Sequence, residues 1–210
     1  IASRGLDESS LVVEVASNDG YLLRNFVEKG IPVLGIDPSP GPGRAAQEIG
    51  VPTLIDFFGE ELAKKVVADG GRKAKVIVAN NVMAHVPFLN DFVAGFAALL
   101  DDDGVLTVEN PYVKELIEHV EFDTIYHEHF CYYSCTAVDR LMRRHGLFLN
   151  DIEFFPDLHG GTCRWYIEKV DRRTERCAAY LDDERARGML DAEYYVHFSS
   201  SVQRGIGELK

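Results

Sequence analysis

Short apolar runs rich in β-branched residues alternate with segments of helical periodicity through the first half of the chain. LVVEVA at residues 11–16 predicts a buried strand, and the turn SNDG leads from it into a helical segment, YLLRNFVEKG. The same order repeats, with further predicted strands at 31–37, 51–56, 73–82 and 104–110. This alternation predicts the doubly wound α/β class, with a mostly parallel sheet, helices on both faces and ligands at the carboxyl ends of the strands.

The second half of the chain departs from this alternation. SCTAVDRLMRRHG predicts a helix with Ser134 as its N-cap and Gly146 at its end. LFLNDIEFF and GGTCRWYIEKV predict a strand pair that adds antiparallel edges to the sheet. From Asp171 onwards the chain is charged and helical in pattern. We therefore expect one main domain over residues 1–170 and a helical arm over residues 171–210.

Composition and charge narrow the classes of function. The chain is 46% hydrophobic and 27% charged, which is typical of a globular protein. Its net charge of -12 disfavours binding to nucleic acid or to anionic lipid. No apolar run reaches the ~20 residues that span a bilayer, and the first ten residues lack the pattern of a signal peptide. Because the four cysteines show no paired spacing, we expect reduced thiols in a cytoplasmic protein.

Two acidic residues mark a candidate cofactor site. Glu14 lies near the end of the first predicted strand and Asp37 at the end of the second, where a carboxylate can accept hydrogen bonds from a ribose diol. The turn after Glu14 contains Gly20 but lacks the other glycines of the G-x-G-x-x-G pattern that a dinucleotide needs, which counts against NAD. An acidic strand end and a polar turn suit S-adenosylmethionine better, because it carries a zwitterionic amino acid and no phosphate.

The segments VEVASNDGYLL, VLGIDPS and VIVANNVMAHVP resemble motifs of class I S-adenosylmethionine-dependent methyltransferases. The departure is an alanine where that superfamily usually has the first glycine of E/D-x-G-x-x-x-G. The resemblance implies S-adenosylmethionine as cofactor and S-adenosylhomocysteine as product. It assigns the methionine part to the turn after the first strand, the ribose to the end of the second, the adenine to two phenylalanines, and the sulfonium side to two asparagines. The cofactor residues are then Glu14, Ala16, Ser17, Asn18, Gly20, Asp37, Pro38, Phe57, Phe58, Asn80 and Asn81. Either phenylalanine fits the hydrophobic core equally well.

The stretch FDTIYHEHFCYYSC first suggests a metal site. His127, His129, Cys131 and Cys135 give the pattern H-x-H-x-C-x3-C, and in an extended strand alternate residues share a face. The H-E-x-x-H spacing of a helical zinc site is absent, and methyl transfer from a sulfonium needs no metal. We therefore expect no metal here.

The same stretch also supplies groups for acid/base chemistry. Tyr126, Glu128 and His129 combine a phenol, a carboxylate and an imidazole, whose unperturbed pKa of ~6.5 suits proton transfer near neutral pH. They can meet on one face of a strand or where a loop turns. The alternative is that two histidines and a glutamate only cap a surface strand.

A narrower resemblance covers nearly the whole chain. SNDGYLL, GIDPS, NNVMAHVP, FDTIYHEHF with YYS, and HGGTCRWYIEK, in this order, resemble the sugar C-methyltransferases that act on nucleotide-linked 4-keto-6-deoxy sugars. The resemblance implies that His129 removes a proton beside the ketone and that Glu128 and Tyr126 orient it or contact the sugar. Further substrate contacts are expected at Tyr21, Asn110 and His159, whereas a structural role is expected for His127.

Other functions and other domains stay open at this point. A small-molecule O- or N-methyltransferase, or a domain that only binds S-adenosylmethionine, fits the cofactor motifs as well. Members of the sugar C-methyltransferase family typically carry an N-terminal zinc-binding domain and a C-terminal α/β domain. Since the chain begins with Ile1 rather than Met, we expect it to be part of a longer enzyme with a sugar nucleotide as its small-molecule partner.

Overall fold

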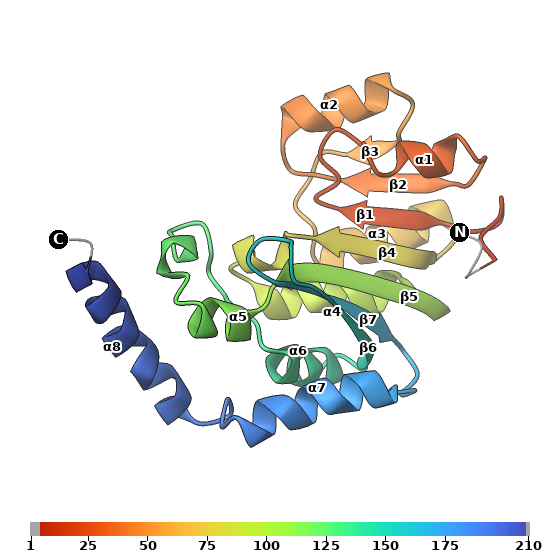
Figure 1. Ribbon diagram of the computed structural model, residues 1–210. Helices are drawn as coiled ribbons and strands as arrows, with labels where there is room; N and C mark the ends of the chain where they lie inside the picture. The colour runs from red at the N-terminus through yellow and green to blue at the C-terminus, as the bar shows by residue number, and fades with distance from the viewer. Residues whose placement is uncertain (1–4, 209–210) are drawn as a thin grey trace.

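The computed structural model describes residues 5–208, so Ile1, which suggested a longer protein, lies outside the described residues. Seven strands form one sheet in the order β3-β2-β1-β4-β5-β7-β6 (Figure 1). The pairs that join β3, β2, β1, β4 and β5 are parallel, whereas β7 runs antiparallel to both β5 and β6. The structure therefore confirms the predicted fold class, including the antiparallel strand pair.

The elements follow the predicted alternation closely. The strands are β1 (Val12–Val15), β2 (Val33–Ile36), β3 (Thr53–Leu54), β4 (Ala74–Asn80), β5 (Leu100–Pro111), β6 (Phe148–Phe155) and β7 (Thr162–Glu168). The helices are α1 (Arg24–Val27), α2 (Pro40–Glu48), α3 (Glu60–Gly70), α4 (Leu89–Leu99), α5 (Val113–Glu118), α6 (Cys135–Arg143), α7 (Glu175–Ala186) and α8 (Ala192–Glu208), with 3-10 turns η2 (Met83–His85) and η3 (Phe122–Thr124).

The helix expected over residues 21–30 is shorter than its apolar pattern suggested. Only the four residues of α1 are α-helical, and they follow a tight turn. The backbone N–H groups of Asn25 and Phe26 in α1 donate to carbonyls three residues back, in that turn, and the Asn25 side-chain amide also donates to the Tyr21 and Leu22 carbonyls. These local bonds favour a turn over a regular helix.

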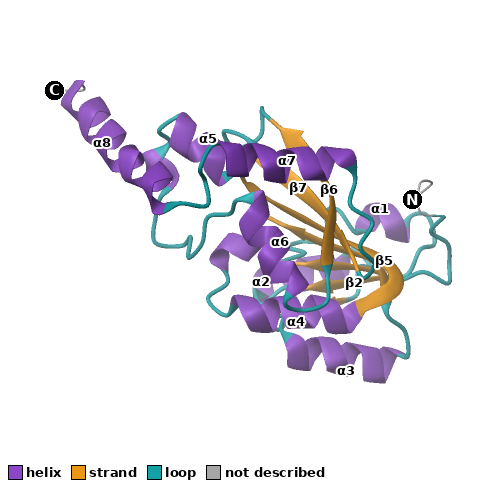
Figure 2. Ribbon diagram, turned by 90° about the horizontal axis from the view of Figure 1, so that it is seen from below, coloured by secondary structure: helices purple, strands orange, loops and turns teal. Residues whose placement is uncertain are grey.

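Each face of the sheet buries its own set of apolar side chains. Val13 and Val15 of β1 belong to the same buried cluster as Phe92, Phe96 and Leu99, which follow one another at helical spacing on α4. Figure 2 shows α3 and α4 together along one side of the strands. Val12 points toward the other face of the sheet, because successive side chains of a strand alternate in direction. There it belongs to a smaller buried cluster that includes residues just before α1 and residues of α2.

The region after β5 contains the remaining helices. The Ser134 side chain accepts a hydrogen bond from the Ala137 N–H at the start of α6, which confirms the predicted N-cap, and Gly146 has a positive φ of 70° after the helix. Within residues 171–210, α7 contacts β6 and α6, whereas α8 projects away from the body of the domain (Figure 1). Across the described residues, no helix combines the length and the apolar character needed to cross a membrane.

The order of the strands fixes where a ligand can bind. The chain passes from β1 outward to β2 and β3, and then returns to the other side of β1 to form β4 and β5. In sheets of this kind the crevice at the carboxyl ends of the strands beside such a reversal is the usual ligand site. Here that crevice lies beside the carboxyl ends of β1 and β4.

Candidate active site

The turn after β1 adopts the backbone that the glycines of the family pattern would provide. Ala16, Asn18 and Gly20 all have positive φ, at 61°, 52° and 77°. The Asn18 N–H donates to Oδ2 of Asp37 over 2.9 Å, and the Ser39 N–H donates to Oδ1 over 2.8 Å. The buried Asp37 carboxylate therefore joins the ends of β1 and β2. Since Ala16 occupies the left-handed region, its methyl group costs roughly 1 kcal/mol relative to glycine without blocking the turn.

Several buried polar atoms at the strand ends have no hydrogen-bond partner among the described residues. They are Oε2 of Glu14, Oγ of Ser17, Oδ1 of Asn80, and both amide atoms of Asn110. An unpaired buried polar atom costs about 1–3 kcal/mol, so atoms of this kind are normally paired with a ligand or with water. Their position at the ends of β1, β4 and β5 identifies this edge of the sheet as a ligand site.

The chemistry of these atoms fits the predicted cofactor. Burial raises the pKa of Glu14 to about 8, and the nearby charges of Asp19 and Asp37 act in the same direction. A carboxyl group in this state gains from a neighbouring positive charge. S-adenosylmethionine carries both an ammonium group and a sulfonium, and its hydroxyl and amino groups can pair with Ser17 and Asn80. The residues present therefore suit this cofactor.

The remaining candidate cofactor residues differ in their surroundings. Phe58 packs between α3 and α4, with its ring 5.4 Å from that of Phe92 and 5.2 Å from that of Phe96. Phe57 is 81% exposed, and Pro38 is exposed at the start of the connection to α2. Phe58 thus has the packing role that was weighed as its alternative, which leaves Phe57 as the aromatic side chain free to approach an adenine.

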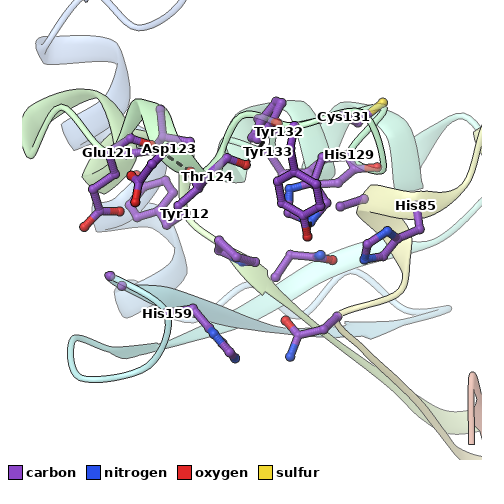
Figure 3. A pocket seen from close by; sticks show the side chains of 18 residues that line it. His85, Tyr112, Glu121, Asp123, Thr124, His129, Cys131, Tyr132, Tyr133 and His159 are labelled. Carbon is purple, nitrogen blue, oxygen red and sulfur yellow. Dashed lines mark hydrogen bonds between the residues drawn. The ribbon is translucent and has the colours of Figure 1, made fainter. Parts of the chain in front are cut away.

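A cavity of about 560 Å³ lies beside the cofactor turn, at the carboxyl ends of β4 and β5 (Figure 3). Four segments line it: the connection after β4, the end of β5, the loop that precedes α6, and the tip of the β6–β7 hairpin. The lining residues are Asn81, Ala84, His85, Asn110, Pro111, Tyr112, Leu116, Glu121, Asp123, Thr124, Tyr126, His129, Cys131, Tyr132, Tyr133, His159, Gly160 and Gly161. Cavities of this size hold small organic ligands.

The stretch around YHEHF forms a loop rather than the strand considered above. After η3, the His129 N–H donates to the Tyr126 carbonyl over 3.1 Å, and this turn brings their side chains together. The Tyr126 hydroxyl lies 3.1 Å from Nε2 of His129. The Phe130 N–H donates to the Ala84 carbonyl over 2.8 Å, which fixes the loop to the connection after β4. The meeting of Tyr126 and His129 at a turning loop is therefore the arrangement observed.

His85 is the residue of this site that sequence reasoning missed. Its ring centroid lies 4.8 Å from that of His129, and its Nδ1 lies 3.1 Å from the Glu128 carbonyl oxygen. Burial lowers the pKa of His129, as does the neighbouring His85, while the Thr124 carbonyl and the Glu128 charge oppose the shift. The imidazole of His129 is therefore kept neutral near neutral pH, the form that can accept a proton. A histidine in the connection that follows a strand, in NNVMAHVP, was the available signal.

Glu128 and His127 point away from the cavity. The Glu128 carboxylate is exposed and lies 3.9 Å from Nε2 of His127, whose side chain is 89% exposed. Cys135 is buried, and its sulfur accepts a hydrogen bond from the Trp165 indole over 3.4 Å. The four residues of the zinc pattern consequently do not converge, and across residues 5–208 no three His, Cys, Asp or Glu side chains form a metal site. Glu128 raises the pKa of His129 through its charge, and its carbonyl group contacts His85.

The three expected substrate contacts lie around the same crevice. Asn110 and His159 line the cavity, and His159 has a positive φ of 48° at the hairpin tip. Tyr21 is 54% exposed beside the cofactor turn. Partial burial raises the pKa of Tyr21, as do the charges of Glu14 and Glu109, which indicates how close its hydroxyl lies to the ends of β1 and β5.

Comparison with known proteins defines the family. The model of the methyltransferase domain family matches residues 2–150, so the chain belongs to this family. A curated relative, the C-methyltransferase NovU of Streptomyces niveus, is 33% identical over 203 residues, which are 95% of this chain and 48% of the relative. The chain thus spans about half the length of the curated relative it matches.

Solved structures agree on the fold. Magnesium protoporphyrin IX methyltransferase from Synechocystis, with bound S-adenosylhomocysteine, is 13% identical with a TM-score of 0.59, over 77% of this chain and 74% of that one. The 1,6-didemethyltoxoflavin-N1-methyltransferase of Burkholderia thailandensis is 17% identical with a TM-score of 0.59, over 81% and 74%. These structures confirm the predicted fold, and the family model confirms the predicted methyltransferase class. The chain is a member of the S-adenosylmethionine-dependent methyltransferases, whose cofactor is S-adenosylmethionine.

Proposed function

We propose that this chain is the catalytic domain of a C-methyltransferase that methylates the carbon beside the ketone of a nucleotide-linked keto-deoxy sugar. One observation carries the proposal: the imidazole of His129 lies against the Tyr126 hydroxyl and lines a cavity of sugar size at the carboxyl ends of β4 and β5. The curated C-methyltransferase relative, which matches 95% of the chain, supports transfer to carbon.

The proposed reaction begins with a proton transfer. A carbon beside a ketone is a weak acid, so a base must remove its proton while hydrogen-bond donors stabilise the enolate oxygen. His129 serves as this base, and Tyr126 holds the imidazole through the contact at Nε2. Glu128 supports the protonated form of His129 by its charge. S-adenosylmethionine, when bound, supplies the electrophilic methyl group.

Donors for the enolate oxygen are available in the same cavity. Asn110 is 1% exposed and its amide group has no partner among the described residues. His85 faces His129 at the end of the cavity where the connection after β4 meets the loop that carries His129 (Figure 3). We assign Asn110 to the ketone oxygen, because a donor that loses no partner on binding acts at little cost.

The charge of the cavity suits a neutral ring. Among the described residues, no lysine or arginine lines it, and Glu121 and Asp123 lie at the end opposite His85 (Figure 3). Carboxylates accept hydrogen bonds from sugar hydroxyl or amino groups but repel phosphate. We therefore expect the sugar ring inside the cavity, with His159 among its contacts, and the nucleotide diphosphate outside it.

We further propose that the chain works within a longer cytoplasmic enzyme, with residues 1–170 as the methyltransferase domain and residues 171–210 as the arm toward another domain. The curated relative is about twice as long as the matched segment. The four cysteines in the described residues are unpaired, which is compatible with a reducing compartment.

Proton exchange at the substrate carbon tests the base directly. In the intact protein, His129→Ala should slow deuterium incorporation beside the ketone of a keto-deoxy sugar nucleotide by about 10²–10⁴-fold, as measured by NMR in deuterated water. His127→Ala is the matched control, since it removes an exposed neighbouring imidazole outside the cavity. Calorimetry should give the same affinity for S-adenosylmethionine in both variants.

Two results would contradict the proposal. Undiminished exchange in His129→Ala would remove His129 as the base. An NMR spectrum that shows the new methyl group on oxygen or nitrogen would replace carbon transfer with one of the other methyltransferase reactions.

A further inference from the structure

Glu184 is a fully buried carboxylate in an unusual place. It lies on α7 with 0% of its surface exposed, and it follows Cys177 and Leu181 on the stripe of α7 that faces the core. An apolar residue is expected at such a position. Among the described residues, no ion pair involves Glu184, so the usual partner of a buried charge, a lysine or arginine, is absent there.

Three hydrogen bonds take the place of that partner. The Cys135 N–H and the Tyr112 hydroxyl donate to Oε1 over 2.6 and 2.8 Å, and the Thr136 N–H donates to Oε2 over 2.8 Å. Two of these donors are the first backbone N–H groups of α6, which carry the positive end of the helix dipole. Charge-assisted bonds of this kind are the stronger class of hydrogen bond. The carboxylate therefore fixes the start of α6 and the Tyr112 ring at once.

Both of these anchored groups belong to the active site. The Tyr112 ring lines the cavity two residues after Asn110 and is 1% exposed. Burial raises the pKa of Tyr112 far above its ordinary value, with Cys135 and Glu184 acting in the same direction, so the phenol stays protonated and keeps donating. Cys135 immediately follows the loop that carries His129.

The end of that loop is held at successive residues. The ring of Tyr132 lies 5.6 Å from that of His129. The Tyr133 carbonyl accepts the Val113 N–H over 3.0 Å, and the Tyr133 hydroxyl donates to the Met83 carbonyl over 2.8 Å. Two and three residues after Tyr133, the Cys135 and Thr136 N–H groups donate to Glu184. If its carboxylate is lost, the return end of the loop loses its anchor to α7.

Glu184 also lies close to the turn that joins α7 and α8, the two helices of the arm. The Met189 N–H donates to the Glu184 carbonyl over 3.0 Å, and Gly188, with a φ of 75°, ends the turn that leads toward α8. Arg187 of the same segment pairs with Glu118 of α5 over 2.7 Å. The carboxylate of Glu184 therefore lies about one helical turn before the connection to α8, so a displacement of α8 also moves the carboxylate.

We propose that Glu184 is a positioning residue that couples the α7–α8 arm to the catalytic loop by holding Tyr112 and the start of α6. The proposal rests on the function proposed above, because the group it positions is His129. It predicts that Glu184 variants change the environment and the rate of proton transfer at His129 while the cofactor turn, which Glu184 does not contact, keeps its affinity.

Two variants of the intact protein remove the hydrogen bonds to Glu184 to different extents. Glu184→Leu removes all three acceptor contacts at similar volume. Glu184→Gln keeps an oxygen for Cys135 and Tyr112 but turns an N–H group toward the Thr136 N–H. We expect deuterium exchange to fall by at least about tenfold in Glu184→Leu and by less in Glu184→Gln, since a small misplacement of a catalytic group costs this much. Asp182→Asn, an exposed carboxylate-to-amide change on the same helix, is the control.

The second readout is independent of the substrate. The ring signals of His129, identified by their loss in His129→Ala, are titrated by NMR. We expect the pKa of His129 to rise toward its ordinary value in Glu184→Leu, because a loosened loop exposes the imidazole to water. Calorimetry should show unchanged affinity for S-adenosylmethionine. If Glu184→Leu does not fold, Glu184→Gln decides the question by the same measurements.

The alternatives are distinguishable. A lower melting temperature with unchanged His129 titration and unchanged exchange would reduce Glu184 to a buried helix cap and overturn the proposal. A parallel loss of cofactor affinity would also overturn it, because the effect would then be general. If wild-type protein shows no exchange at all, the proposed function fails, and the titration alone still decides whether Glu184 positions His129.

Discussion

The two sides of the active-site crevice are built in different ways. On the cofactor side, Glu14, Asn18 and Asp37 lie at or directly after adjacent parallel strands, and one backbone N–H joins two of them. On the side of the cavity, His129 lies in a loop that owes its shape to contacts with η2, α5 and α7. The first side is specified by local backbone geometry, whereas the second depends on packing between distant segments.

This difference has a consequence for specialisation. Strand ends and tight turns place their groups wherever the sheet forms, so the cofactor side can stay the same while the chemistry changes. A loop held by side chains such as Glu184 and Tyr133 can be reshaped by substitutions far from the substrate. Function therefore varies more easily in the loop than in the scaffold that carries it.

The largest effect expected in a test of this comparison is a loss of cofactor affinity that leaves the cavity side unchanged. The two carboxylate oxygens of Asp37 accept the Asn18 and Ser39 N–H groups. Asp37→Asn replaces one of these oxygens with an NH2 group, which can only donate. Because a hydrogen bond to a charged group contributes about 1.5–3 kcal/mol, the affinity for S-adenosylmethionine measured by calorimetry should fall about 10–100-fold. The NMR titration of His129 should not change. Asp69→Asn, an exposed carboxylate on α3, is the control, and equal losses in the two variants would contradict the assignment.

A smaller effect tests the backbone of the cofactor turn. Ala16→Gly places a glycine where φ is 61°, so it should stabilise the fold by roughly 1 kcal/mol and raise the melting temperature by about 2–4 °C. Ala68→Gly, at an exposed position inside α3, should have the opposite sign, because glycine costs roughly 0.5–1 kcal/mol within a helix. A lower melting temperature for Ala16→Gly would show that the methyl group makes a stabilising contact.

The smallest effect sharpens the electrostatics of the loop. His85→Asn removes a ring whose charge lowers the pKa of His129 but keeps a side-chain donor for the Glu128 carbonyl. The pKa of His129 should therefore rise toward its ordinary value. Because the base must be neutral, the rising limb of the pH profile of kcat/KM should move to higher pH by the same amount. A shift to lower pH would indicate that His85 stabilises the protonated form of His129, and it would contradict this assignment.

The sequence predicted the cofactor side more fully than the cavity. Glu14, Asp37 and the asparagines after β4 follow strands whose apolar pattern is plain, so their position at one edge follows from the fold class. Phe58 was ambiguous because an aromatic residue after a strand suits the core and a ligand equally well. The strand interpretation of YHEHF was incomplete for a similar reason, since alternation of residue types does not reveal that a loop turns back.

Sequence alone thus predicted the fold class, the cofactor turn and His129 as a candidate base, because these depend on residues close together along the chain. Only the tertiary structure decided that His85 faces His129, that Glu128 and His127 point outward, and that Glu184 holds the active site. These contacts join residues 43, 49 and 72 positions apart. Local patterns carry no information about such pairs, since the folding of the sheet and the docking of α7 bring them together.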